Sequence, residues 1–337
     1  MTQHGQAEIV GGSTLRLHDA DRSSSLDISF QRTLRIPDDG RAYPLPPGLG
    51  AFPLRLVRDH ASRVPESWVE RGGVFLPMYQ REAMWLHFGG APHALKIGIG
   101  KVCAVSGRRW ADGLSSSPQD YVVTGAQPWL DGIASGKGTI RQFVAMPLGL
   151  GYTVEGQLTG QETFGGIQIQ SYAPHPGRIP ARYGIEDHEC CLAMPAAAPR
   201  SRGTSGSMGL AAGGRMVQKI YPDPHGIDVW NQGSRVRVFV HIVNSELWRD
   251  ITGEAPPKTP VTARSYSKAG LPWFDLYDES AATLAPTGAL AGVKSVVEID
   301  AAKSTLPLQD DEPVAVPVVK KLLWKYRRAV EVDDGDW

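Results

Sequence analysis

Residues 140–172 read IRQFVAMPLGLGYTVEGQLTGQETFGGIQIQSY, and this stretch decides the fold class of the chain. Its apolar residues alternate with polar or small ones in two runs, at Tyr152, Val154 and Leu158 and then at Ile167 and Ile169. Alternation with a period of two is typical of a half-buried β-strand, and the glycines between the runs favour turns. The stretch therefore predicts β structure, and it carries no recognisable catalytic signature.

Two further segments extend this pattern. Residues 26–36 (LDISFQRTLRI) and residues 236–242 (VRVFVHI) alternate apolar and polar side chains almost throughout. The 38 glycines and 26 prolines are spread along the chain, which indicates many turns between short strands rather than one disordered tract. We therefore expect a mainly β fold built from sandwich-like antiparallel sheets.

Helical signals are few and short. We expect short helices in ESWVER (66–71), in ELWRDIT (246–252) and within residues 260–269, because a proline or a capping side chain precedes them and a glycine follows. We also expect a C-terminal amphipathic helix over residues 317–330. Its apolar stripe comprises Val319, Leu322, Leu323, Tyr326 and Val330.

Two local irregularities are predicted between these elements. Apolar residues alternate on odd positions up to Ile99 and on even positions from Val102, so the switch predicts a β-bulge at Gly100. Pro128 precedes WLDGI (129–133), where we expect a helical turn.

The composition divides the chain into five segments. Residues 1–22 are expected to form a flexible N-terminal arm, residues 23–172 a β-rich unit, and residues 173–207, rich in Pro, Ala, Ser and Gly, a linker or long loop. Residues 208–300 form a second β-rich part, and residues 301–337 a tail that holds the helix 317–330. Whether the two β-rich parts pack as one unit stays open at this point.

Charge and cysteine content narrow the classes of partner and compartment. The 35 basic and 35 acidic residues cancel, which argues against binding to nucleic acid or to an anionic membrane. No apolar stretch approaches the roughly 20 residues of a membrane-spanning helix, so we expect a soluble protein without a transmembrane segment. Three cysteines and no signal-peptide pattern favour free thiols in the cytoplasm.

One carboxylate pair stands among aromatic residues in LPWFDLYDES (271–280). Asp275 and Asp278 lie beside Trp273, Phe274 and Tyr277. Paired carboxylates next to aromatic rings suit glycoside hydrolysis or a sugar-binding platform. The same pattern also occurs in ordinary surface turns, so both interpretations stay open.

His241 is a third candidate catalytic residue, together with Asp275 and Asp278. It lies on the odd-numbered face of the segment 236–242, next to Phe239 and Val243. A lone histidine in apolar company is more often a hydrogen-bonded packing residue than a catalytic base, and we favour that interpretation.

The only cluster with metal-ligand chemistry is Asp187-His188-Glu189-Cys190-Cys191. His188, Cys190 and Cys191 are zinc-ligand types, but adjacent residues of an extended chain point apart and no second ligand pair follows. We therefore expect no metal and no cofactor.

Three glycine-rich segments resemble catalytic or phosphate-binding loops without matching them. GIASGKG (132–138) and GIGK (98–101) lack the spacing and the hydroxyl of a P-loop, and we interpret both as turns between strands. GTSGSMGLAAGG (203–214) does not match the G-x-S-x-G pattern, because Ser207 stands where the last glycine belongs. We interpret this last segment as a flexible hinge.

Several longer phrases resemble an uncharacterised family of actinobacterial and fungal proteins. They include LPMYQREAMW (76–85), RQFVAMPLGLGYTVE (141–155), MGLAAGGRM (208–216) and GLPWFDLYDE (270–279). The resemblance spans most of residues 70–295 and implies one coherent unit across the 173–207 segment. It implies no activity for any residue of this chain.

These observations favour a non-catalytic binding or self-assembling β protein, which acts through a protein partner or through copies of itself. Exposed strand edges and glycine-rich loops are suitable material for such contacts. The alternative is a carbohydrate-active hydrolase or sugar-binding protein that uses Asp275, Asp278 and the neighbouring aromatic residues, with carbohydrate as its ligand.

Overall fold

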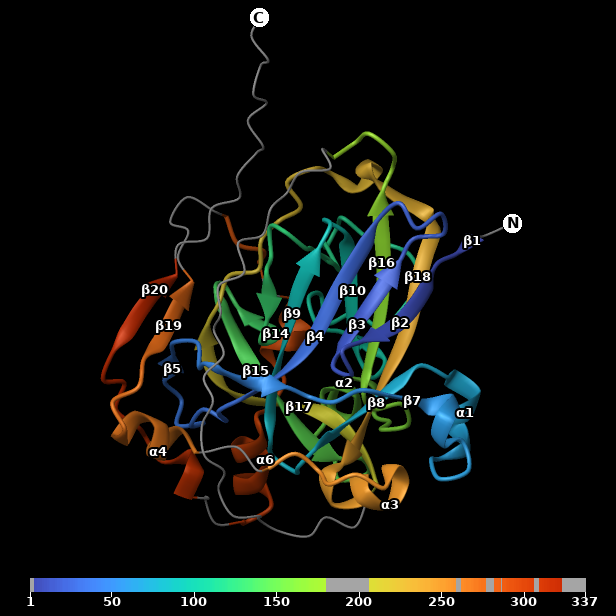
Figure 1. The fold of residues 1–337 in the computed structure, drawn as a ribbon. Coiled ribbons are helices and arrows are strands. Elements are labelled where there is room, and N and C mark those ends of the chain that lie inside the picture. The colour runs from blue at the N-terminus through green and yellow to red at the C-terminus, as the bar shows by residue number, and fades with distance from the viewer. Residues whose placement is uncertain are drawn as a thin grey trace, which may run out of the picture.

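The computed structural model describes residues 3–179, 206–258, 262–276, 282–285, 287–305 and 309–322. Its secondary structure is mainly β, with large antiparallel sheets and short helices, as the alternating patterns predict (Figure 1). No helix in the described part of the chain has the length and apolarity needed to cross a membrane.

Two rows of strands form the body of the molecule. In the first row, β4 (Ser25–Thr33) pairs with β9 (Ala83–Gly90), β9 with β15 (Thr139–Pro147), and β15 with β17 (Ser207–Val217). The second row contains β10 (Ala94–Ile99), β16 (Ile167–Pro174), β18 (Trp230–Asn244) and β8 (Val74–Met78), in that order. A short pairing of β17 with β18 joins the two rows.

The core lies between these rows. A single cluster of buried side chains includes Ile28 and Leu86 from the first row and Ile97, Ile169 and Val238 from the second. On β18, every second residue from Val236 to Ile242 is buried, as the alternation predicts. Burial of these side chains is the main force that holds the two rows together.

Short strands and helices complete the described part of the fold. The short strands are β1 (Gln3–His4), β2 (Gln6–Val10), β3 (Thr14–His18), β5 (Ala42–Tyr43), β6 (Gly48–Ala51), β7 (Arg55–Leu56), β11 (Val102–Cys103), β12 (Val122–Val123), β13 (Trp129–Leu130), β14 (Gly132–Gly136), β19 (Trp273–Leu276) and β20 (Val319–Leu322). The α-helices are α1 (Glu66–Arg71), α2 (Val154–Thr159), α3 (Trp248–Thr252), α4 (Ala263–Lys268), α5 (Gly288–Ala291) and α6 (Val296–Ala302). Single 3₁₀ turns cover Val57–His60, Ile227–Val229, Ser245–Leu247 and Gln309–Asp311.

The three short helices predicted before residue 270 are confirmed. α1 follows Pro65, α3 ends at Gly253, and α4 lies within residues 260–269. The side chain of Asn244 accepts a hydrogen bond of 3.1 Å from the amide of Glu246, so it caps the turn that leads into α3.

Two strands that precede residues 180–205 are hydrogen-bonded to strands that follow this segment. β16 pairs with β18 from Ile167↔Val240 onward, and β15 pairs with β17 from Thr139↔Val217 onward. The segment expected as a linker over 173–207 therefore begins within β16 and ends within β17, and its residues 180–205 lie outside the described part. The hinge expected over 203–214 is likewise strand β17 from Ser207 onward.

The prediction of a flexible arm over residues 1–22 is wrong for the described residues 3–22. β2 pairs with β3, and β3 pairs with β4, so these residues extend the first row. Leu15 and Leu17 are fully buried in the core, opposite Ile28 and Leu26. Burial of these two side chains offsets the conformational entropy that a free arm would keep.

The half-buried strand predicted from Tyr152 to Leu158 is also wrong, because these residues enter helix α2. Thr153 caps the helix by accepting a hydrogen bond of 3.0 Å from the amide of Gly156, and Gly160 ends it in the left-handed conformation. Val154 and Leu158 are four residues apart, a spacing that suits one face of a helix as well as one face of a strand.

Two local predictions need correction in the same way. Gly100 does not form a bulge: it lies with Lys101 in a tight turn between Ile99 and Val102, which pair directly. WLDGI is not a helical turn, since it forms β13 and the start of β14, with Leu130 and Ile133 buried in the core. The turns predicted at the two glycine-rich segments are confirmed only at their ends: GIGK ends in the β10–β11 turn, whereas GIASGKG is strand β14 up to Gly136 and only Lys137 and Gly138 form the turn to β15.

The helix predicted over 317–330 is wrong at its beginning. Val319–Leu322 form β20, a strand parallel to β19 in which Val319 is opposite Trp273. Backbone pairing with β19 outweighs the weak helix preference of a short amphipathic segment. Residues 323–337 lie outside the described part.

Candidate functional site

The carboxylate–aromatic segment maps onto β19. Trp273 is 0% exposed, and its ring packs against Tyr43 and Tyr266 with centroid distances of 6.0 and 6.3 Å. Its faces are therefore not available to stack on a sugar. Phe274 is half-buried and pairs with Leu45, and Asp275 pairs with β20; Tyr277 and Asp278 lie outside the described residues.

His241 is buried on β18. It is 2% exposed, its Nε2 is 3.0 Å from the carbonyl oxygen of Gly72, and its ring stacks on Trp68 at 4.6 Å. Burial lowers the pKa of His241 to about 4, so the ring is neutral at physiological pH. This is the environment of a packing residue.

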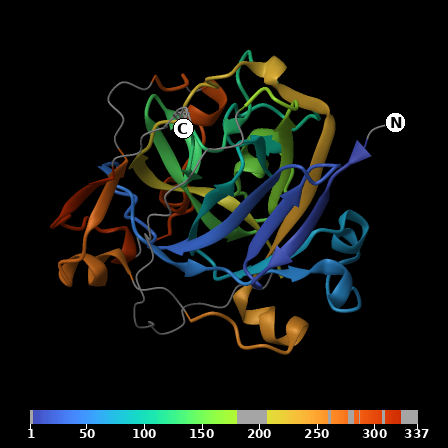
Figure 2. The same ribbon diagram turned by 45° about the horizontal axis from the view of Figure 1, so that its top comes forward.

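The sequence-predicted site residues do not come together. Asp275 belongs to β19 and His241 to β18, and Figure 1 shows these two strands on opposite sides of the molecule, as does the turned view in Figure 2. Ser207 instead lines an apolar pocket of about 350 Å³ with Trp68 and Val243. His188, Cys190 and Cys191 lie outside the described residues, among which no group of three or more metal-ligating side chains occurs.

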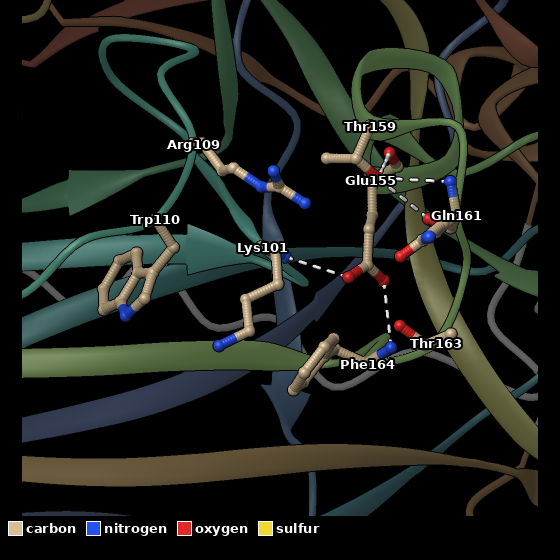
Figure 3. A pocket seen from close by; sticks show the side chains of 8 residues that line it. All are labelled: Lys101, Arg109, Trp110, Glu155, Thr159, Gln161, Thr163 and Phe164. Atoms are coloured by element: carbon tan, nitrogen blue, oxygen red, sulfur yellow. Dashed lines mark hydrogen bonds between the residues drawn. The ribbon is translucent and has the colours of Figure 1, made fainter.

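A different pocket combines cations with aromatic rings (Figure 3). Its volume is about 190 Å³. The lining residues come from the β10–β11 turn, the loop after β11, helix α2 and the loop that follows α2: Lys101, Arg109, Trp110, Glu155, Thr159, Gln161, Thr163 and Phe164.

Glu155 fastens three of these segments together. Its carboxylate accepts hydrogen bonds from the amides of Lys101 (3.1 Å), Phe164 (3.2 Å) and Gly165 (2.9 Å). Burial raises the pKa of Glu155, and these backbone donors oppose the rise. Because both carboxylate oxygens are engaged, we interpret Glu155 as the residue that positions the pocket walls.

The turn that presents Lys101 is shaped by Gly100. Its φ of +54° lies in the left-handed region, which favours glycine. A Cβ atom at this position would lie 2.4 Å from Cδ of Glu155, so glycine also allows the close approach of the carboxylate. The amide of Trp110 donates to the carbonyl of Lys101 at 2.8 Å, which holds the next loop beside the turn.

Two cations lie against one aromatic ring. Nζ of Lys101 is 4.2 Å from the ring centroid of Phe164, and the guanidinium carbon of Arg71, at the end of α1, is 4.3 Å from the same centroid. Burial lowers the pKa of Lys101, and the charges of Arg71 and of Arg237 on β18 lower it further. Lys101 and Arg71 each lie within 4.3 Å of one ring centroid, so these two cations are close enough to repel one another.

In the described part of the chain, none of these cations forms a close ion pair. Across the described ranges, no carboxylate lies within 4.0 Å of the charged nitrogens of Lys101, Arg71, Arg109 or Arg237. By contrast, the nearby Arg235 forms an ion pair of 2.8 Å with Asp112. Glu155 and Asp112 act on Lys101 from beyond ion-pair distance, so the carboxylates of the described site balance its positive charge only in part.

Trp110 forms one end of the pocket. A Cβ atom at Gly98 would lie 2.5 Å from Cε3 of Trp110, so the indole packs directly on the backbone of β10. Nζ of the buried Lys96 lies over the same ring, 5.4 Å from its centroid. One face of Trp110 is thus supported by protein while the residue stays half-buried at the pocket.

Comparison with protein-family models, curated proteins and solved structures gave no match. The chemistry of the pocket therefore follows from its own geometry. Its lining contains two hydroxyl groups, and that of Thr159 already donates to the carbonyl of Glu155 at 2.7 Å. The lining has no histidine, cysteine or serine. Such a site can bind an anion.

The sequence patterns did not reveal this site. The turn at GIGK is confirmed, but the contact of its Lys101 with Phe164, far along the chain, leaves no local signal. A balanced total charge also hides a local group of unpaired cations. The one available hint was glycine followed by lysine at the end of a strand.

Proposed function

We propose that this protein is a non-catalytic binding protein that recognises an anionic ligand at the pocket around Lys101. The proposal rests on Lys101 and Arg109, which line the pocket, and on Arg71 and Arg237, whose charges act on Lys101 from beside it. The described residues supply no carboxylate within ion-pair distance of these four cations. Groups of this kind repel one another when the pocket is empty, and a bound anion relieves that repulsion.

The pocket walls support the same proposal. Arginine offers a planar fork for oxyanions, and lysine offers a compact charge. Thr163 and Gln161 add neutral hydrogen-bonding groups at the rim. We prefer anion binding to carbohydrate hydrolysis because Trp273 is buried. Its burial removes the sugar-binding platform on which carbohydrate hydrolysis would depend.

The test is the affinity for inorganic pyrophosphate, measured by calorimetry at low ionic strength. We expect Lys101→Met and Arg71→Met each to weaken binding by about 10-fold or more, because a charge-assisted hydrogen bond contributes roughly 1.5–3 kcal/mol. Lys137→Met is the matched control, since Lys137 is exposed in the β14–β15 turn and should change affinity less than about 2-fold. No binding at millimolar pyrophosphate, or equal effects of all three substitutions, contradicts the proposal.

Two expectations from the sequence remain part of the proposal. We propose a cytoplasmic location, which cell fractionation tests, and association with a protein partner or with further copies of the chain. Light scattering of the purified protein tests self-association, and a monomer at high concentration would limit the proposal to a partner that carries the anionic group.

A further inference from the structure

We infer that the anion is a nucleoside phosphate, with its base stacked on Trp110 and its phosphate held by Lys101 and Arg71. This inference rests on the proposed function and assigns the ligand of the same pocket. The juxtaposition that carries it is an aromatic platform at one end of the pocket and unpaired cations beside it, with Lys101 lying between Trp110 and Phe164 (Figure 3).

Trp110 is built as a fixed platform rather than as a flexible surface side chain. Gly98 leaves the space that the indole fills, and any larger residue there would displace the ring. Below the ring, Nζ of Lys96 forms an ion pair of 2.7 Å with Asp120 and donates to the carbonyl of Gly113 at 2.7 Å. Because Lys96 is buried and doubly held, the cation stays under one face of the ring.

The spacing of platform and cations suits a ligand with two ends. Gly98 on β10 is opposite Gln168 on β16, and Gln168 is opposite Phe239 on β18. The backbones that carry Arg237 on β18 and Arg71 at the end of α1 therefore lie about two strand spacings, about 10 Å, from the strand that supports Trp110, and Lys101 extends from the β10–β11 turn to the ring of Phe164. A ribose between base and phosphate bridges a separation of this order, whereas a bare oxyanion occupies only the cationic end.

The size of the pocket favours the same class of ligand. Its volume of about 190 Å³ is below the roughly 300–1,000 Å³ that encloses a whole drug-sized ligand. We infer that the pocket encloses the sugar and phosphate and leaves the base on the open face of the indole. Aromatic stacking accepts any base, so the structure assigns the class and not one nucleotide.

The experiment compares four probes on the full-length protein by calorimetry: adenosine 5′-monophosphate, ribose 5-phosphate, inorganic phosphate and adenosine. We expect the monophosphate to bind at least about 10-fold more tightly than ribose 5-phosphate, since a stacked base contributes roughly 10- to 100-fold in affinity. In Trp110→Leu the two affinities should become equal, with that for ribose 5-phosphate unchanged, and Trp110→Tyr should restore the difference. Trp129→Leu, at another half-buried tryptophan, is the control.

Each outcome decides one of the two proposals. Equal affinities for the monophosphate and ribose 5-phosphate in the unmodified protein overturn the nucleoside assignment and leave anion binding intact. A difference that survives in Trp110→Leu also overturns it, because the base then stacks elsewhere. If none of the four probes and no pyrophosphate binds, both proposals fail. Circular dichroism of each variant separates loss of binding from loss of the fold.

Discussion

At the scale of single residues, Asp131 makes stability depend on pH. This carboxyl group is buried in the core, where its Oδ2 accepts a hydrogen bond of 2.7 Å from Gln218. The amide of Asp131 donates to Gln218 in return at 3.1 Å. Burial raises the pKa of Asp131 to about 7, so the folded protein holds a proton that the unfolded chain loses near pH 4.

We predict that Asp131→Asn increases the free energy of unfolding at pH 8. A raised pKa contributes stability below the unfolded pKa, and this contribution is lost as the pH rises through about 7. Asparagine stays neutral and keeps an oxygen for Gln218, so the gain at pH 8 should be about 2–4 kcal/mol. Urea unfolding at pH 5 and pH 8 measures it, and a variant that loses as much stability between these values as the parent protein would refute the prediction.

The pKa of His241 shifts in the opposite direction to that of Asp131. Its pKa is lowered to about 4, so the folded state resists a proton that the unfolded state accepts near pH 6.5. Stability from this residue is complete above pH 6.5 and is lost as the pH falls toward 4. Between pH 4 and pH 6.5 the two contributions therefore change in opposite directions and largely offset each other.

At the scale of elements, the pocket depends on the β10–β11 turn and helix α2 meeting through Glu155. The turn was predictable from its glycines, and the helix was not, because Val154 and Leu158 suit a strand and a helix equally. The side-chain cap by Thr153 and the left-handed conformation of Gly160 favour the helix over the strand. Such caps are visible in a sequence only once the element type is known.

We predict that Gly100→Ala destabilises the protein more than Gly138→Ala does. Both glycines have positive φ values, +54° and +69°, so alanine adds about 1 kcal/mol of backbone strain at each. At Gly100 the new Cβ also meets Glu155 at 2.4 Å, whereas at Gly138 its nearest neighbour, Cγ of Lys219, is 3.9 Å away. Denaturant unfolding should show an additional loss of about 1–3 kcal/mol for Gly100→Ala, and equal losses would show that the contact with Glu155 relaxes freely.

At the scale of the whole molecule, local patterns gave the strands but not their partners. Residues 26–36 and 236–242 are strands as predicted, yet nothing in either pattern indicates that Ile167 pairs with Val240. The pocket is lined by the β10–β11 turn, the loop after β11, α2 and the loop that follows α2. Long-range strand pairing places Arg71 of α1 and Arg237 of β18 beside it. Sequence motifs therefore could not predict the site, although local sequence features explain each element that forms it.

We predict that the N-terminal strands are part of the core, in contrast to a flexible arm. Leu17→Ala removes a fully buried side chain and should lower the free energy of unfolding by about 2–5 kcal/mol. Leu150→Ala makes the same change where the leucine is 48% exposed, and it should cost less than about 0.5 kcal/mol. Similar losses in the two variants, measured by urea unfolding, would mean that residues 6–18 do not pack as described.

The pairing of β15 with β17 and of β16 with β18 has a consequence for biosynthesis. While the ribosome has made only the first 179 residues, β15 and β16 each have one edge without its final neighbour. The sheet closes only after residue 244 has left the exit tunnel, since β18 ends there. Until its second half has emerged, the nascent chain therefore exposes these unpaired strand edges to other chains.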